Sequence, residues 1–146
     1  MNFEQKQELR EFNCLYKEIE KLYHDIAIKA GMSDSSFFIL YTIVELGNGC
    51  LQKDVSDMYS INKQTIHSSI RNLEKNGYIF LKKGKGRNMH IYLTEEGEKL
   101  IQQKMIPIME AENDVFTAMT AQESKELLRL NKKYTALLHQ KMSRFL

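Results

Sequence analysis

The segment from Asn62 to Lys75 carries hydrogen-bonding side chains at helical spacing. Successive residues of an α-helix rotate by about 100°, so Ile66, Ile70 and Leu73 share one face and leave a polar face opposite. Amide, hydroxyl, imidazole and guanidinium groups can pair with the donors and acceptors that base edges present in the major groove of DNA. The side chains that we expect to make such groove contacts are Gln64, Thr65, His67, Ser68 and Arg71.

An ordinary amphipathic helix with its polar side in water is the alternative interpretation of this segment. The surrounding charge favours DNA contact. Between Leu51 and Tyr92 there are eight lysine and arginine residues against three aspartate and glutamate residues, whereas the rest of the chain is net negative within an overall charge of +2. A local basic excess is typical of a surface that binds phosphates. The cations expected at phosphates or in the minor groove are Lys53, Lys63, Lys85 and Arg87.

Two short helices are predicted to position these side chains. The first runs from Gln52 to Tyr59, and a tight connection follows through Ser60 and Ile61. The second begins after Asn62, a good N-cap residue, and ends at Lys75 before Gly77. Two short helices separated by a turn form a helix-turn-helix.

A β-hairpin with a basic tip follows the second helix. Residues 78–81 are typical of a strand, GKGRN is typical of a turn, and residues 89–93 are typical of a returning strand. Helix, turn, helix and hairpin in this order predict a winged helix-turn-helix lobe over residues 33–93. The predicted fold class is therefore mainly α with a small β-hairpin wing, in a single domain over residues 1–146.

Long helices are predicted on both sides of this lobe. Apolar residues at three- and four-residue spacing predict a buried stripe on a helix from about Gln5 to Ala30 and another on the last helix, which the capping box Thr120–Glu123 opens. Between them, Thr94 caps a helix that we expect to kink or split near Pro107.

The apolar residues at the two ends exceed what a small monomeric core can absorb. They include Phe3, Leu9 and Phe12 near the beginning and Leu137, Leu138, Phe145 and Leu146 near the end. We therefore predict an obligate homodimer, with residues 1–30 and 94–146 as dimerisation helices.

Other classes of protein are disfavoured by the sequence. The most apolar run, FFILYTIVEL, is shorter than the roughly 20 residues of a membrane-spanning helix. The opening residues lack the pattern of a secretory signal, so the expected location is the cytoplasm. Scattered histidines and two cysteines predict neither a metal site nor a cofactor. Because we find no nucleophile with a base, carboxylate pair or phosphate-binding glycine loop, we do not expect an enzyme.

The run LQKDVSDMYSINKQTIHSSIRNLEKNGYI, a basic hairpin leading to LTEEGEKL, and the closing TAQESKELLRLNKKY together resemble the MarR family of bacterial transcriptional regulators. The resemblance implies a triangular homodimer in which each recognition helix enters a major groove of an operator and each wing reaches the adjacent minor groove. Arg87 stands where the family has a wing arginine. Lys85 replaces the acidic residue usual two positions earlier, which argues against an aspartate-braced wing.

The resemblance also implies a repressor released from a pseudo-palindromic operator by a small aromatic or phenolic effector. The residues available for such a ligand are Tyr16, Tyr23, His24, Phe38 and Tyr41, for which an aromatic core is the alternative role. Some members of the family sense peroxides through a cysteine on the first helix, where this chain has Cys14. A dimeric protein-interaction module without DNA binding is the remaining alternative.

Overall fold

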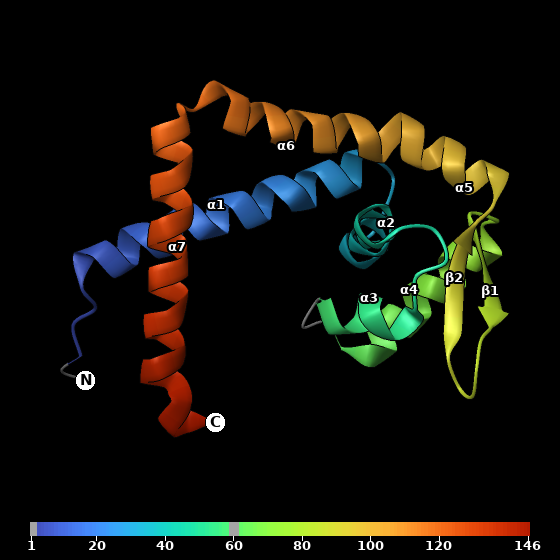
Figure 1. Ribbon diagram of the computed structural model, residues 1–146, viewed down its shortest axis with the longest axis horizontal. Helices are drawn as coiled ribbons and strands as arrows, with labels where there is room; N and C mark the ends of the chain where they lie inside the picture. Colours follow the sequence, from blue (N-terminus) through green and yellow to red (C-terminus); the bar gives the residue numbers. More distant parts are fainter. Residues whose placement is uncertain (1–2, 59–61) are drawn as a thin grey trace. The chain divides into compact units, whose positions relative to one another are not determined.

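The computed structural model describes residues 3–58 and 62–146 (Figure 1). Tyr59, Ser60 and Ile61, predicted as the end of one helix and the connection to the next, lie outside the described residues. No helix within the described ranges is long and apolar enough to cross a membrane.

The chain divides into two compact units, Met1–Met105 and Ile106–Leu146, which are described separately. The first unit contains α1 (Gln7–Lys29), α2 (Asp34–Leu46), α3 (Gln52–Met58), α4 (Lys63–Lys75), β1 (Ile79–Lys83), β2 (Met89–Leu93), α5 (Glu95–Leu100) and the π-helical segment η1 (Ile101–Met105). The second contains α6 (Ile106–Ala118), α7 (Ala121–Met142) and the short 3₁₀ turn η2 (Ser143–Phe145). This order confirms a mainly α fold with a small β-hairpin wing.

Helix α2 forms the centre of the core of the first unit. It begins where the hydroxyl of its N-cap Ser33 accepts a hydrogen bond from the Ser36 N–H. Phe37, Leu40 and Ile43 are fully buried, and the helix contacts α1, α3, α4 and η1. Its apolar residues therefore hold the helix-turn-helix against the rest of the unit, because burial of apolar surface is the main driving force of packing.

The wing is a two-stranded antiparallel hairpin. Its register pairs Ile79 with Leu93 and Lys83 with Met89, so β1 begins one residue later than predicted and reaches Lys83. The chain before α3 also pairs with β2, since the Ile91 N–H donates to the Cys50 carbonyl at 2.9 Å. This pairing ties the wing to the start of α3.

The predicted buried stripes on the first and last helices are wrong for the single chain. Ala27 is the buried residue of α1, and α7 has no buried residue. Leu15 on α1 is 62% exposed and Leu137 on α7 is 47% exposed. Within the first unit α1 packs against α2, and the buried residue Ala27 lies near the C-terminal end of α1. Leu46 at the end of α2 and Met58 at the end of α3 are exposed as well.

Helix ends follow the predicted caps. The Thr120 hydroxyl accepts from the Glu123 N–H at 3.1 Å, and the Glu123 carboxylate accepts from the Thr120 N–H at 2.8 Å. That backbone hydrogen bond lowers the pKa of Glu123. Pro107 has no N–H to donate to the Gln103 carbonyl, and the π-helical segment Ile101–Met105 lies shortly before it; the kink or split expected near Pro107 stays a prediction.

Gly97 in the LTEEG segment allows α5 to pack directly on the wing. Its N–H donates to the hydroxyl of the N-cap Thr94 at 3.0 Å, and that hydroxyl donates to the Gly77 carbonyl. A Cβ added at Gly97 would overlap the main-chain carbonyl group of Tyr78, whose carbon would be 2.9 Å away. No side chain fits at this position without moving the backbone.

We predict that Gly97→Ala lowers the free energy of unfolding by about 1 to 3 kcal/mol, because overpacking against a main-chain group forces the helix and the hairpin apart. Urea denaturation followed by circular dichroism measures this change. Glu98→Ala alters an exposed residue of the same helix and is the matched control, with an expected change well under 1 kcal/mol. Equal stabilities of the two variants would contradict the close packing of α5 on Tyr78.

Candidate nucleic-acid interface

Helix α4 presents one apolar and one polar face. Ile66, Ile70 and Leu73 are buried, as predicted. The opposite face is polar and open to solvent, so every groove-contact candidate on this helix is accessible. The exposed residues of that face are Gln64, Thr65, His67, Ser68 and Arg71.

Two hydrogen bonds help to fix where α4 begins and how it is rotated. The side chain of Asn62 accepts from the Gln64 N–H at 2.8 Å, which confirms the predicted N-cap. The buried Ser69 hydroxyl lies 2.6 Å from the buried Ser35 hydroxyl of α2. A buried polar pair is costly to break, so it favours one rotational setting of α4 against α2.

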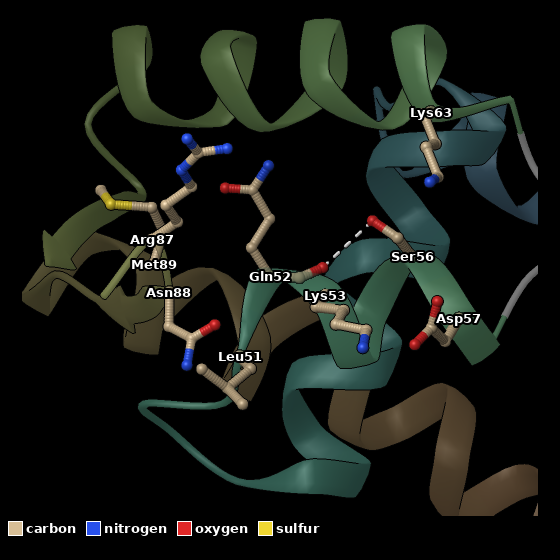
Figure 2. A pocket seen from close by; sticks show the side chains of 9 residues that line it. All are labelled: Leu51, Gln52, Lys53, Ser56, Asp57, Lys63, Arg87, Asn88 and Met89. Atoms are coloured by element: carbon tan, nitrogen blue, oxygen red, sulfur yellow. Dashed lines mark hydrogen bonds between the residues drawn. The ribbon is translucent and has the colours of Figure 1, made fainter. Parts of the chain in front are cut away.

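A groove of about 360 Å³ lies between α3, the beginning of α4 and the tip of the wing (Figure 2). Three cations line it: Lys53 from α3, Lys63 from α4 and Arg87 from the wing. The structure thus brings together three of the four predicted phosphate contacts. Lys85, the fourth, is exposed near the wing tip and is not among the groove residues.

The three groove cations are free to attract an anion from solution. None of Lys53, Lys63 and Arg87 forms an ion pair within residues 3–58 and 62–146. All three are exposed, and Arg87 is not paired with an acidic wing residue, as the replacement by Lys85 predicts. Unpaired cations that converge on one groove attract an anion from solution more strongly than isolated cations do.

The wing tip is held in a tight turn. The Gly84 N–H donates to the Asn88 carbonyl at 2.8 Å, and Gly86 has a φ of +66°. Glycine adopts this left-handed conformation without steric cost. The turn therefore places Arg87 and Asn88 at the edge of the groove, where Figure 2 shows the Arg87 guanidinium pointing toward α4.

Several groove residues were not predicted from the sequence. Gln52, Ser56 and Asp57 come from α3, and Asn88 comes from the wing turn. The Ser56 hydroxyl donates to the Gln52 carbonyl at 3.1 Å (Figure 2). Positions 52, 53, 56 and 57 recur at three- and four-residue spacing, so the polar side of α3 was a signal that could have found them.

The predicted effector residues lie mostly on the α1–α2 side of the first unit. Tyr23 and Phe38 have ring centroids 6.5 Å apart, and Tyr41 reaches them through Phe37. The His24 imidazole contacts the Asp34 carboxylate at 2.9 Å. Tyr16 is exposed nearer the start of α1. This packing accounts for Tyr23, Phe38 and Tyr41 as part of an aromatic cluster, and the ligand role of all five residues stays a prediction.

The two cysteines differ in accessibility. Cys14 is a free, exposed thiol on α1, which satisfies one requirement for a redox sensor, and that role stays a prediction. Cys50 is half-buried, and burial raises the pKa of its thiol. A raised pKa disfavours the reactive thiolate at Cys50.

Comparison with known proteins agrees with this geometry. Residues 21–104, more than half of the chain, match the family model described as transcriptional regulator SarA/Rot. The matched residues include α2, the helix-turn-helix, the wing and α5. No curated protein sequence matches the chain.

Solved structures of MarR family regulators have the same fold. NMB1585 from Neisseria meningitidis is 19% identical and covers 97% of this chain and 100% of its own, with a TM-score of 0.80. A MarR protein from Peptoclostridium difficile is 20% identical with a TM-score of 0.70 over 100% and 96% of the two chains. Staphylococcus aureus MepR, solved in complex with DNA, is 19% identical with a TM-score of 0.68 over 92% and 99%. The chain therefore has the winged-helix fold of the MarR regulators and belongs to the SarA/Rot family of DNA-binding transcriptional regulators.

Proposed function

We propose that this regulator is a homodimeric repressor that binds a pseudo-palindromic operator. The observation that carries the proposal is the joint exposure of the polar face of α4 and of the cationic groove beside it. In each subunit the polar face of α4 contacts base edges in a major groove, while Lys53, Lys63, Lys85 and Arg87 contact phosphates or the adjacent minor groove.

The apolar faces of α1 and α7 support dimerisation. Phe3, Leu15 and Ile19 near the beginning and Leu128, Leu137 and Phe145 near the end are each more than 45% exposed. Monomeric proteins rarely leave so much large apolar surface in water, since its burial is favourable. Residues 1–30 and 94–146 supply the dimer contacts in this proposal, and two copies then present two recognition helices to half-sites about one helical turn apart.

Effector release is the regulatory part of the proposal. A Staphylococcus aureus MarR has been solved in complex with salicylate and kanamycin, at 18% identity to this chain and a TM-score of 0.69. By analogy, a small aromatic molecule bound near Tyr16, Tyr23, His24, Phe38 and Tyr41 shifts the population of dimers away from the spacing that fits DNA. The contact between α1 and α2 couples this region to the helix-turn-helix.

Selection of bound duplexes from a random DNA pool by the purified protein tests the proposal. The selected duplexes are then titrated by fluorescence anisotropy at several salt concentrations, and light scattering gives the mass of the free protein. We expect a near-palindromic site, a steep loss of affinity with salt, and a dimeric mass, because two cationic surfaces release counterions on binding.

Two outcomes of this selection would contradict the proposal in different ways. A folded dimer that enriches no sequence and shows no salt-dependent affinity would favour the protein-interaction module. A protein that is monomeric at micromolar concentration and still binds DNA would refute the homodimer but not DNA binding. In that case the selected sequences should contain a single half-site.

We predict that Arg71→Ala weakens binding to the selected site by about 1 to 3 kcal/mol and relaxes the base preference at one position in each half-site. The reason is that a guanidinium on the exposed face of α4 can form a bidentate pair with a guanine. Competition titrations with single-base variants of the site measure both effects.

Lys132→Ala removes the same charge from α7, outside the surface proposed to contact DNA, and is the matched control. It should leave the base preference unchanged. An equal loss of affinity by Arg71→Ala on every sequence would show that Arg71 contacts a phosphate instead of a base.

A further inference from the structure

Asp57 places a carboxylate in the groove that is otherwise lined by cations and neutral side chains. It lies on α3 one turn after Lys53, and both residues line the groove with Lys63 (Figure 2). Among the described lining residues it is the one that carries negative charge. An acidic group is unexpected on a surface that attracts phosphates.

The fold itself gives no reason for this carboxylate. Asp57 is exposed, and it forms neither an ion pair nor a side-chain hydrogen bond within the described parts of the chain. It also stands in the last turn of α3, which ends at Met58. The carbonyl groups at the end of a helix disfavour negative charge, so an aspartate at this position destabilises the helix slightly.

The Asp57 carboxylate weakens the binding of an anion in the groove. A phosphate that approaches Lys53, Lys63 and Arg87 is attracted by three cations and repelled by the Asp57 carboxylate. Two unit charges a few ångströms apart in water change an equilibrium constant about fivefold. One carboxylate therefore weakens phosphate binding without abolishing it.

We propose that this groove holds a phosphate of the DNA backbone and that Asp57 limits how tightly the phosphate is held. The proposal rests on the proposed function, because it takes DNA as the ligand. Backbone phosphates are the same in every sequence, so Asp57 lowers affinity for operator and non-operator DNA by the same factor. Asp57 thereby lowers affinity without changing sequence preference, which the polar face of α4 determines.

The test compares wild-type protein with Asp57→Asn on a duplex of about 30 base pairs of arbitrary sequence, by anisotropy titration at several salt concentrations. Asparagine keeps the size of the side chain and removes its charge. We expect Asp57→Asn to bind about fivefold more tightly near 0.1 M salt. The same factor should appear on the duplexes selected from the random pool.

Asp54→Asn is the matched control, because Asp54 is exposed on the same helix but does not line the groove. It should change affinity less than twofold. Equal gains by the two variants would overturn the proposal and leave only a general effect of net charge. Weaker binding by Asp57→Asn would also overturn it.

The outcome also separates this proposal from the function on which it rests. Wild-type protein with no salt-dependent DNA affinity would contradict both the proposed function and the role of Asp57. Wild-type protein that binds DNA, with Asp57→Asn no different from wild type, would overturn the role of Asp57 alone. Denaturation of Asp57→Asn should show stability at least equal to wild type, since its charge opposes the helix dipole.

Discussion

The packing of α4 against α2 is the constraint on which the DNA-binding surface depends. Ile66, Ile70 and Leu73 cannot leave the core without exposing apolar surface, and the buried contact between Ser35 and Ser69 favours one rotation of the helix. Once that face is buried, the geometry of a helix leaves Gln64, His67, Arg71 and their neighbours in solvent. The packing of α4 in the core therefore determines which of its side chains are available for base contacts.

The groove arises because three separate segments are tied to that same core. Cys50 pairs with β2 just before α3, so the wing and α3 are joined by main-chain hydrogen bonds. Gly97 lets α5 pack on Tyr78 at the other end of the hairpin. These contacts hold Lys53 and Arg87 at one groove with Lys63, although they lie far apart in the sequence. Rigid placement of charges reduces the entropic cost of binding a phosphate.

Much of this could be predicted from local pattern. Helix periodicity and capping residues such as Asn62 and Thr120 predict where the helices lie. The apolar face of α4 also predicts which side of that helix is exposed. The spacing of Gln52, Ser56 and Asp57 marks the polar side of α3, but the groove itself could not be predicted, because it forms only where α3 and the wing turn at Asn88 meet in space. Likewise, the apolar stripes of α1 and α7 show the same spacing whether they face their own core or another chain, so the spacing alone did not predict their exposure in the single chain. The excess of apolar residues at the two ends was the signal that favoured it.

The central claim is that the polar face of α4 and the cationic groove form the surface that meets DNA. Hydrogen–deuterium exchange of the protein with and without a duplex to which it binds tests this claim most directly. We expect slower exchange in residues 62–72 and 84–89 when DNA is bound, and unchanged exchange in residues 121–142 of α7. Slower exchange confined to α1 or α7, with residues 62–72 and 84–89 unaffected, would contradict the account.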